Sequence, residues 1–329
     1  MSGERMPIAA VGAGRMGRGI AHVFAYGGHP VALVDFKARR AADFARLAAD
    51  AKAEIEANLR ALAGEGVFDA AHVPAILGRI RVVPAEEAES ALRQAALVWE
   101  GVPERIEDKA DALARMSELA PDAIIASTTS TMLVTELQRH VQRPERFLNA
   151  HFLNPAFLIP LVEVSPSPST DEAVTRRLMT MLEAIGKVPV RCAASPGYII
   201  PRLQALLLSE AARMVHEGVA SAEDIDKAVR TGFGPRYAVM GPIEFIDYGG
   251  LDIAFYACHY MAKALDSPRH APPPELDALM KEGKRGLREG QGYYDWRGID
   301  TDAYRRRRFA EFVKLFGYLG EMPKPAEPV

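Results

Sequence analysis

A glycine-spaced turn near the N-terminus constrains the fold more than any other feature of the chain. Gly12, Gly14 and Gly17 form a Gly-x-Gly-x-x-Gly pattern that follows an apolar run, 8–11, and opens a helical stretch. In such a turn the first glycine allows the tight change of direction. The second leaves room for a pyrophosphate, and the third lets helix and strand pack closely. The phosphates then lie at the positive end of the helix, so we predict a dinucleotide-binding fold.

An acidic residue after the next apolar run indicates which dinucleotide is bound. Asp35 follows the run 31–34 and lies 23 residues after Gly12. A carboxylate at this position accepts hydrogen bonds from both ribose hydroxyls and repels a 2′-phosphate, which favours NAD over NADP. Arg39 and Arg40 follow shortly afterwards and weaken this preference slightly. A turn without a nucleotide, or one that binds FAD, stays a minor alternative.

Short β-branched runs alternate with helical stretches through the first part of the chain, which predicts a parallel sheet covered by helices. The expected strands are 8–11, 31–34, 80–83, 97–99, 124–126, 147–150, 161–164 and 188–190. A long Ala-rich helix over about 38–63 is expected beside the sheet, as an arm able to reach over a ligand.

The residue pattern changes near residue 194, after which the β-rich runs stop. Helical patterns follow, as at 203–218 and 222–231, and Ser221 is placed to cap the second of these. We therefore expect an α/β, Rossmann-type domain over 1–193 and an all-helical domain over 194–329. The Pro-rich tail 323–329 is expected to be disordered.

Composition limits the classes of partner. Charged residues make up 25% and hydrophobic residues 49% of the chain, its net charge is −3, and no run of about 20 residues is uniformly apolar. These values argue against a nucleic-acid partner and against a membrane span. Cys192 and Cys258 lie far apart without metal-ligand spacing, so we expect no metal site. The N-terminus lacks the features of a signal peptide, and we expect a cytoplasmic protein.

A histidine, a glutamate and a hydroxyl cluster suggest acid–base chemistry at the carboxyl edge of the sheet, where open α/β sheets bind ligands. Ser130 belongs to the hydroxyl-rich segment 127–131, His151 follows a later strand, and Glu163 lies in the next one. Oxidising an alcohol by hydride loss needs a base, and imidazole titrates near neutral pH. His151 alone is more often an ordinary polar residue, but these neighbours favour a catalytic base.

Taken together, the motifs resemble those of the L-3-hydroxyacyl-CoA dehydrogenases, from Met6 to about Gly298. In the first part of the chain the matching segments are 12–21, Asp35, 99–104, 126–131, 151–155 and 161–164. In the second part they are 196–198, 222–226, 240–242, 247–248 and 292–295.

The resemblance implies an NAD-binding domain followed by a helical domain that forms a homodimer. It implies hydride transfer between NAD and C3 of a 3-hydroxyacyl-CoA, with a short chain such as 3-hydroxybutyryl-CoA expected, and a role in fatty acid metabolism. It makes His151 the acid/base, Glu163 its orienting partner and Ser130 the donor to the reacting oxygen. Glu100 is implied to lie near the nicotinamide. The expected cofactor residues are Gly12, Gly14, Met16, Gly17, Asp35, Glu100 and Asn154.

Three positions depart from the pattern of the family. Pro201 stands where an asparagine usually helps to bind the substrate oxygen, and proline has no N–H to donate. Oxygen stabilisation then depends on His151 and Ser130, with Gln204 one turn further on. Residues 127–130 read Ser-Thr-Thr-Ser in place of Ser-Asn-Thr-Ser. Pro160 replaces a common lysine, as in the lambda-crystallin and L-gulonate dehydrogenase branch.

The substrate therefore stays open at this point. Where family members hold the CoA phosphates with lysines on the helical arm, this chain offers Lys52, Asn58 and Arg60 with weaker correspondence. One alternative is a dehydrogenase of a free hydroxy acid such as L-gulonate or L-carnitine. Another is a catalytically weakened NAD-binding protein similar to lambda-crystallin.

Overall fold

A computed structural model describes residues 5–322 and residue 325, so most of the predicted tail lies outside the described residues. The chain divides into two compact units, Met1–Leu207 and Leu208–Val329. This division falls within helix α8 (Ile200–His216). The expected domain boundary at residues 193 and 194 stays a prediction.

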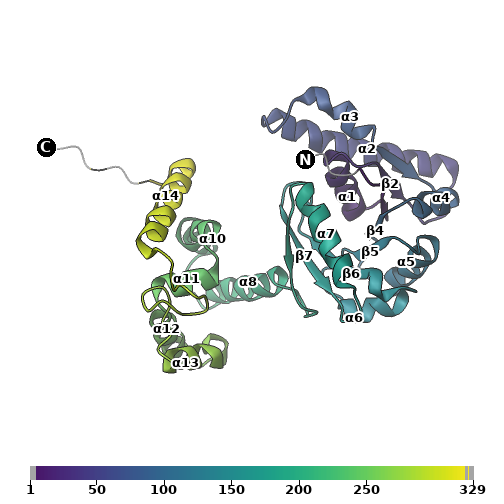
Figure 1. Ribbon diagram of the computed structural model, residues 1–329. Helices are drawn as coiled ribbons and strands as arrows, with labels where there is room; N and C mark the ends of the chain where they lie inside the picture. Colours follow the sequence, from purple (N-terminus) through teal and green to yellow (C-terminus); the bar gives the residue numbers. More distant parts are fainter. Residues whose placement is uncertain (1–4, 323–324, 326–329) are drawn as a thin grey trace. The chain divides into compact units, whose positions relative to one another are not determined.

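An eight-stranded sheet forms the first unit, with the strand order β3-β2-β1-β4-β5-β6-β7-β8 (Figure 1). The strands are β1 (Ile8–Val11), β2 (Val31–Val34), β3 (Ile80–Val83), β4 (Leu97–Glu100), β5 (Ile124–Ser127), β6 (Phe147–Phe152), β7 (Leu161–Pro166) and β8 (Val188–Arg191). Every predicted strand is present. The order reverses between β1 and β4, and open α/β sheets bind ligands at such a reversal.

Strand β7 departs from the predicted parallel sheet because it runs antiparallel to β6, whereas the other pairings are parallel. The connection 153–160 is too short for the crossover that a parallel pair requires. Strand β6 also continues beyond residue 150, so that His151 lies inside the strand. The antiparallel register places His151 directly opposite Glu163, and opposed residues project from the same face of a sheet.

The connecting helices cover both faces of the sheet (Figure 1). They are α1 (Arg15–Tyr26), α2 (Ala41–Gly64), α3 (Val73–Leu77), α4 (Ala88–Arg93), α5 (Ile106–Leu119), α6 (Val134–Leu137) and α7 (Glu172–Ala184). The predicted arm is α2, which buries Ala51, Ile55 and Leu59. This spacing of four residues forms one apolar stripe along a helix.

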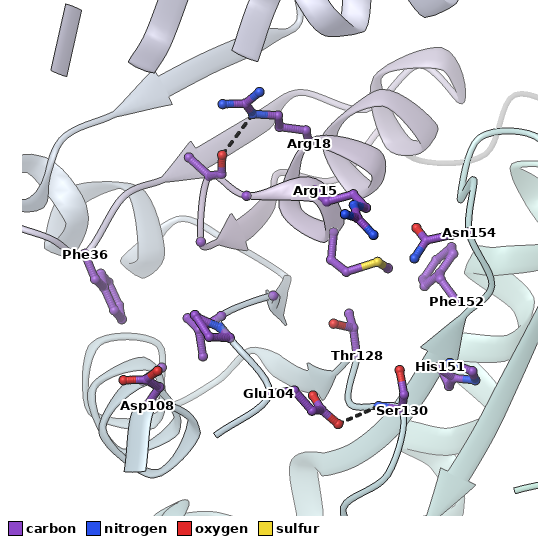
Figure 2. Close-up of a pocket in the computed structure, with 18 of the residues that line it drawn as sticks. Arg15, Arg18, Phe36, Glu104, Asp108, Thr128, Ser130, His151, Phe152 and Asn154 are labelled. Atoms are coloured by element: carbon purple, nitrogen blue, oxygen red, sulfur yellow. Dashed lines mark hydrogen bonds between the residues drawn. The ribbon is translucent and has the colours of Figure 1, made fainter. Parts of the chain in front are cut away.

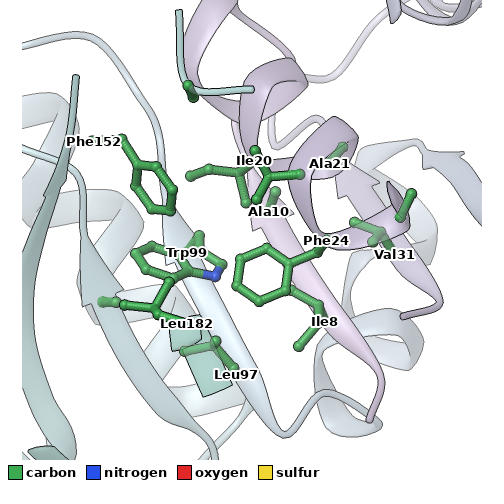
Figure 3. Close-up of a cluster of buried hydrophobic side chains, with 14 of the residues drawn as sticks. Ile8, Ala10, Ile20, Ala21, Phe24, Val31, Leu97, Trp99, Phe152 and Leu182 are labelled. Carbon is green, nitrogen blue, oxygen red and sulfur yellow. The ribbon is translucent and has the colours of Figure 1, made fainter. Parts of the chain in front are cut away.

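Two apolar cores lie on the two sides of the sheet. Side chains from α1, α2, α3 and α7 build one core, and side chains from α4, α5 and α6 build the other. Successive residues of β1 alternate between them, because neighbouring side chains in a strand point to opposite faces. In the first core, the ring centroids of Phe24 and Phe152 lie 5.7 and 5.2 Å from that of Trp99 (Figure 3).

The second unit is helical, as predicted. Its helices are the C-terminal part of α8 together with α9 (Ala222–Ala228), α10 (Gly234–Val239), α11 (Pro242–Gly249), α12 (Leu251–Ala264), α13 (Pro274–Lys281) and α14 (Thr301–Leu319). The predicted cap is present, since the Ser221 hydroxyl accepts a hydrogen bond from the Asp224 N–H at 3.1 Å. Buried Asp247 accepts hydrogen bonds from Tyr293 N–H, Tyr294 N–H and Trp296 Nε1 and so holds the loop before α14.

The two later glycines of the turn have different steric surroundings, which predicts different effects of substitution. A Cβ at Gly17 would lie 1.8 Å from the Gly12 carbonyl oxygen, whereas one at Gly14 meets no atom within 4 Å. We expect Gly17→Ala to destabilise the chain by about 1–3 kcal/mol, because overpacking forces the backbone apart. Gly14→Ala should melt near the wild-type temperature. Thermal unfolding followed by circular dichroism tests this, and equal losses of Tm would contradict it.

Candidate active site

A cavity of about 1320 Å³ lies within the first unit, at the carboxyl ends of β1, β2, β4 and β5. Seven of the predicted site residues line it, namely Gly12, Gly14, Met16, Asp35, Ser130, His151 and Asn154. Figure 2 shows Ser130, His151 and Asn154 on one side of the cavity and Phe36 and Asp108 on the other. Residues from five separate parts of the chain therefore meet at the edge of the sheet where ligands are expected.

The glycine turn leaves an open cradle at the start of α1. Gly12 has a φ of +101°, and a Cβ there would lie 2.6 Å from the carbonyl oxygen of Gly101. Only glycine fits this combination of positive φ and close backbone approach. The space above Gly14, by contrast, is open. An open space over exposed N–H groups at a helix N-terminus suits a phosphate, so these residues fit a dinucleotide.

Asp35 lies at the end of β2, as predicted, and is 4% exposed. Its Oδ2 accepts a hydrogen bond from Arg39 Nε, and Lys37 N–H donates to Oδ1 at 3.3 Å. Nearby, the Arg115 guanidinium lies 4.0 Å from the centroid of the Phe36 ring. The carboxylate thus lines the cavity with Arg39 beside it, and this ion pair is a feature that the acidic residue alone did not predict.

Glu100 is fully buried and does not line the cavity, and its place at the nicotinamide stays a prediction. Both of its oxygens accept hydrogen bonds from Lys109 Nζ at 2.9 Å. Ser127 Oγ donates to Oε2 at 2.5 Å, and Val102 N–H donates to Oε1 at 2.8 Å. A carboxylate with this many partners belongs to a buried ionic network that supports the floor of the site.

Glu104, which follows Glu100 by four residues, does line the cavity, although no sequence feature pointed to it. Its Oε1 accepts hydrogen bonds from Thr129 Oγ1 at 2.5 Å and from the Ser130 N–H at 2.9 Å (Figure 2). Lys109 Nζ lies 3.1 Å from Oε2. Burial raises the pKa of Glu104, but the hydrogen bond from Thr129 and the charge of Lys109 lower it more, so the net pKa falls below its usual value. The ionised carboxylate of Glu104 therefore fixes the loop that carries Ser130.

His151 and Glu163 form the pair that the sequence predicted. The Nδ1 of His151 lies 2.8 Å from Glu163 Oε2, with 7% of the histidine and none of the glutamate exposed. Because a carboxylate only accepts, Nδ1 carries the proton in this hydrogen bond and Nε2 is left for the cavity. The other oxygen, Oε1, accepts hydrogen bonds from the N–H groups of Ile199 and Ile200 at 2.8 and 2.7 Å.

The start of α8 also reaches the cavity. Pro201 and Gln204 line it together with Ser130 and His151. The two helix residues singled out from the sequence thus lie beside the catalytic candidates. The proline carries no donor, whereas the amide of Gln204 does.

A smaller cavity of about 160 Å³ lies between α1, α2 and the connection 154–157. Arg15, Arg18 and Asn154 line both cavities, and Asn58 of the arm lines the smaller one. Arg18 bridges the two helices through Glu54, at 2.5 Å. Lys52 and Arg60, the other two candidates on the arm, are exposed, and Arg60 pairs with Glu56.

A buried histidine lines the smaller cavity, and a buried lysine contacts the backbone of its wall. His22 is 2% exposed, stacks on Phe157 with 4.8 Å between ring centroids, and has no partner for Nδ1 among the described residues. Lys187 Nζ donates to the carbonyl oxygens of Ala156 and Ile159 at 2.5 and 2.9 Å. Arg15 and Arg18 bring positive charge to the smaller cavity, Lys187 lies behind its wall, and Glu54 pairs with Arg18.

Comparison with known proteins identifies the class of enzyme. The NAD-binding domain model of 3-hydroxyacyl-CoA dehydrogenase matches residues 7–195, and the C-terminal domain model of the same family matches residues 197–296. The chain therefore belongs to the 3-hydroxyacyl-CoA dehydrogenase family and is an NAD-dependent oxidoreductase. The resemblance, the fold class and the cofactor inferred from the sequence are confirmed.

Several individual relatives are similar over most of their length. The human mitochondrial hydroxyacyl-coenzyme A dehydrogenase is 34% identical, over 88% of this chain and 91% of that protein. The 5-formyl-3-hydroxy-2-methylpyridine 4-carboxylate 5-dehydrogenase of Mesorhizobium japonicum is 32% identical, over 94% of this chain and 96% of that protein. The crystal structure of a 3-hydroxyacyl-CoA dehydrogenase from Archaeoglobus fulgidus has a TM-score of 0.77 and 30% identity, and covers 96% of this chain and 100% of that one.

None of the helices in the described part of the chain is both long enough and apolar enough to span a bilayer. Within residues 5–322, no group of three or more His, Cys, Asp or Glu side chains is arranged to hold a metal ion.

Burial of His22 predicts a loss of stability in mild acid. Burial, and then the nearby charge of Lys187, lowers the pKa of His22 from 6.5 to about 4. The imidazole therefore binds a proton more readily in the unfolded chain than in the folded one. The contribution of His22 to the free energy of unfolding is complete above pH 6.5 and is lost as the pH falls towards 4. Between pH 7 and pH 5 we expect the wild type to lose about 2 kcal/mol through this group.

The His22→Gln variant should lack that part of the pH dependence, and His72→Gln, on an exposed turn, should retain it. Urea unfolding at pH 7 and pH 5 measures the difference. The assignment to His22 fails if His22→Gln loses as much stability between these pH values as the wild type does.

Proposed function

We propose that the chain oxidises an L-3-hydroxyacyl-CoA with a short acyl chain, such as 3-hydroxybutyryl-CoA, to the 3-ketoacyl-CoA. The observation that carries this proposal is the buried His151–Glu163 pair, 2.8 Å apart, beside Ser130 in the cavity that also contains the glycine cradle. Bound NAD supplies the acceptor for the hydride. A relative from Bradyrhizobium diazoefficiens with 33% identity is named 3-hydroxybutyryl-CoA dehydrogenase, which supports the chain length and a role in fatty acid metabolism.

His151 has the geometry of a general base for the substrate hydroxyl. With Nδ1 held by Glu163, Nε2 takes the hydroxyl proton, and the resulting imidazolium is stabilised by the adjacent carboxylate of Glu163. Ser130 donates a hydrogen bond to the reacting oxygen. Its loop is fixed by the four hydrogen bonds that Glu104 Oε1 accepts from residues 129–131.

The cofactor residues follow from the shape of the larger cavity. We assign the phosphates to the cradle of Gly12, Gly14 and Gly17, and the ribose to Asp35. Met16 and Asn154 are assigned to the part of the cavity near His151. Glu104 takes the direct role that the sequence gave to Glu100. Glu100 then acts indirectly, because Lys109 bonds both carboxylates.

The second candidate substrate is a free hydroxy acid, such as L-gulonate or L-carnitine. It is favoured by the similarity to the pyridine carboxylate dehydrogenase, whose crystal structure has a TM-score of 0.67 at 30% identity and covers 97% of this chain. The cationic cavity of Arg15 and Arg18 suits an anionic group in either case, a CoA phosphate or a free carboxylate. A weakened, crystallin-like protein is the third candidate. The complete His151–Glu163–Ser130 set argues against it.

Comparing substrates tests the proposal. We expect NADH to form from L-3-hydroxybutyryl-CoA and not from L-gulonate or L-carnitine, measured side by side at 340 nm. His151→Ala should lower kcat by at least about 10²-fold, because a positioned base contributes this much or more. Its affinity for NADH, measured by fluorescence titration, should stay near the wild-type value.

Other outcomes separate the candidates. Turnover of a free acid alone would establish the second candidate, and NADH binding without any turnover would favour the third. Near-normal turnover by His151→Ala would reject the histidine as the base, whatever the substrate.

We also propose a cytoplasmic homodimer that associates through residues 194–329, with NAD bound by residues 1–193. Helix α8 has no buried residue, and it exposes between 41% and 67% of Leu203, Leu206, Leu207 and Leu208. Exposed leucines in such a row usually mark an association surface. Light scattering should give twice the chain mass of 35.9 kDa. A monomer at micromolar concentration would contradict the dimer, and fractionation of cells that make the protein tests the compartment.

A further inference from the structure

Tyr198, just before α8, contacts His151 and the residue before Ser130 without lining the cavity, and the two residues after it bind Glu163. It is 6% exposed. Its ring stacks on the imidazole of His151, with centroids 5.3 Å apart and an angle of 12° between the planes. We propose that Tyr198 is a positioning residue that holds His151, Glu163 and the Ser130 loop in register, an inference that rests on the proposed function.

The tyrosine hydroxyl connects the strand of the base to the loop of the serine. It donates to the carbonyl oxygen of Thr129 at 3.0 Å and accepts from Asn149 Nδ2 at 3.0 Å. Thr129 directly precedes Ser130, and Asn149 lies two residues before His151 on the same face of β6. Asn149 Nδ2 also donates to the Met132 carbonyl oxygen at 3.0 Å. One buried hydroxyl thus fixes both elements that present the reactive groups.

The backbone of the same turn holds the glutamate. Gly197 and Tyr198 have positive φ values of +74° and +45°, and a tyrosine adopts such a conformation only where its surroundings enforce it. The turn aims the next two N–H groups, of Ile199 and Ile200, at Glu163 Oε1. The Tyr198 ring therefore covers one face of the imidazole while the adjoining backbone binds the carboxylate that orients it.

The chemistry of the phenol suits a fixed donor. Burial is the main cause that raises the pKa of Tyr198 well above its usual range. The hydroxyl therefore stays neutral and keeps donating to Thr129 wherever imidazole can act as a base. A phenylalanine at this position would keep the stacked ring, but it would leave the Thr129 carbonyl oxygen and the Asn149 amide without this partner.

The Tyr198→Phe variant tests the proposal. We expect kcat to fall about 10-fold to 10²-fold, since small misplacements of reacting groups lower rates by this order, while KM for NAD changes less than twofold. The matched control is Tyr304→Phe, which removes the hydroxyl of a tyrosine with the same 6% exposure, bonded to Glu244 in the second unit. Its kcat should stay within twofold of the wild type. Unchanged kcat in Tyr198→Phe would overturn the proposal.

A double-mutant cycle separates positioning from a general effect on folding. In a Glu163→Gln background, adding Tyr198→Phe should lower kcat by much less than it does in the wild type, because both residues act through His151. Equal losses in the two backgrounds would show that Tyr198 acts independently of the pair and would reject the proposal.

The last readout needs no substrate, so it distinguishes failure of this inference from failure of the proposed function. The His151 Nδ1 proton is shielded between Glu163 and the Tyr198 ring, and we expect a low-field proton resonance for it in the wild type. Tyr198→Phe should exchange this proton with solvent faster, and Tyr304→Phe should not. Identical exchange in all three proteins would contradict a positioning role.

Discussion

The site depends on the hydrogen bonds that the buried carboxylate of Glu163 accepts. An ionised group without solvent is strongly unfavourable unless hydrogen bonds replace its hydration. Here His151 occupies one oxygen and the N–H groups of Ile199 and Ile200 occupy the other. The histidine belongs to β6, the two N–H groups to the start of α8, and the glutamate to β7. Satisfying one charge therefore fixes three elements relative to one another.

The topology of the sheet makes this arrangement possible. The reversal between β1 and β4 opens the cavity, and the parallel strands on either side deliver the glycine cradle, Asp35 and the Ser130 loop to one edge. The antiparallel β6–β7 pair adds a direct pairing of opposed side chains across two strands. Its register sets His151 opposite Glu163, so both residues are held by main-chain hydrogen bonds and do not depend on a flexible loop.

A second ionic network supports the loop that carries Ser130. Lys109 lies between Glu100 and Glu104, and Glu104 in turn binds the loop that carries Ser130. From the sequence, two glutamates four residues apart could not be told from each other, because both follow the same apolar strand. Burial separates them: β4 extends through Glu100 and turns its side chain into the interior, whereas Glu104 lies beyond the strand at the cavity. The lysine nine residues after Glu100 was the only signal of this network.

The sequence by itself determined the strands, the cofactor and His151 and Glu163 as a candidate pair, because apolar runs, the glycine turn and the His and Glu residue types are local features with direct physical consequences. Gly12, Asp35, His151 and Glu163 were all found in this way. Tertiary structure alone decided which groups meet. The direction of β7, the ion pair between Arg39 and Asp35, and the stacking of Tyr198 on His151 all join residues through space. Such contacts depend on burial and register, which one-dimensional periodicity does not contain.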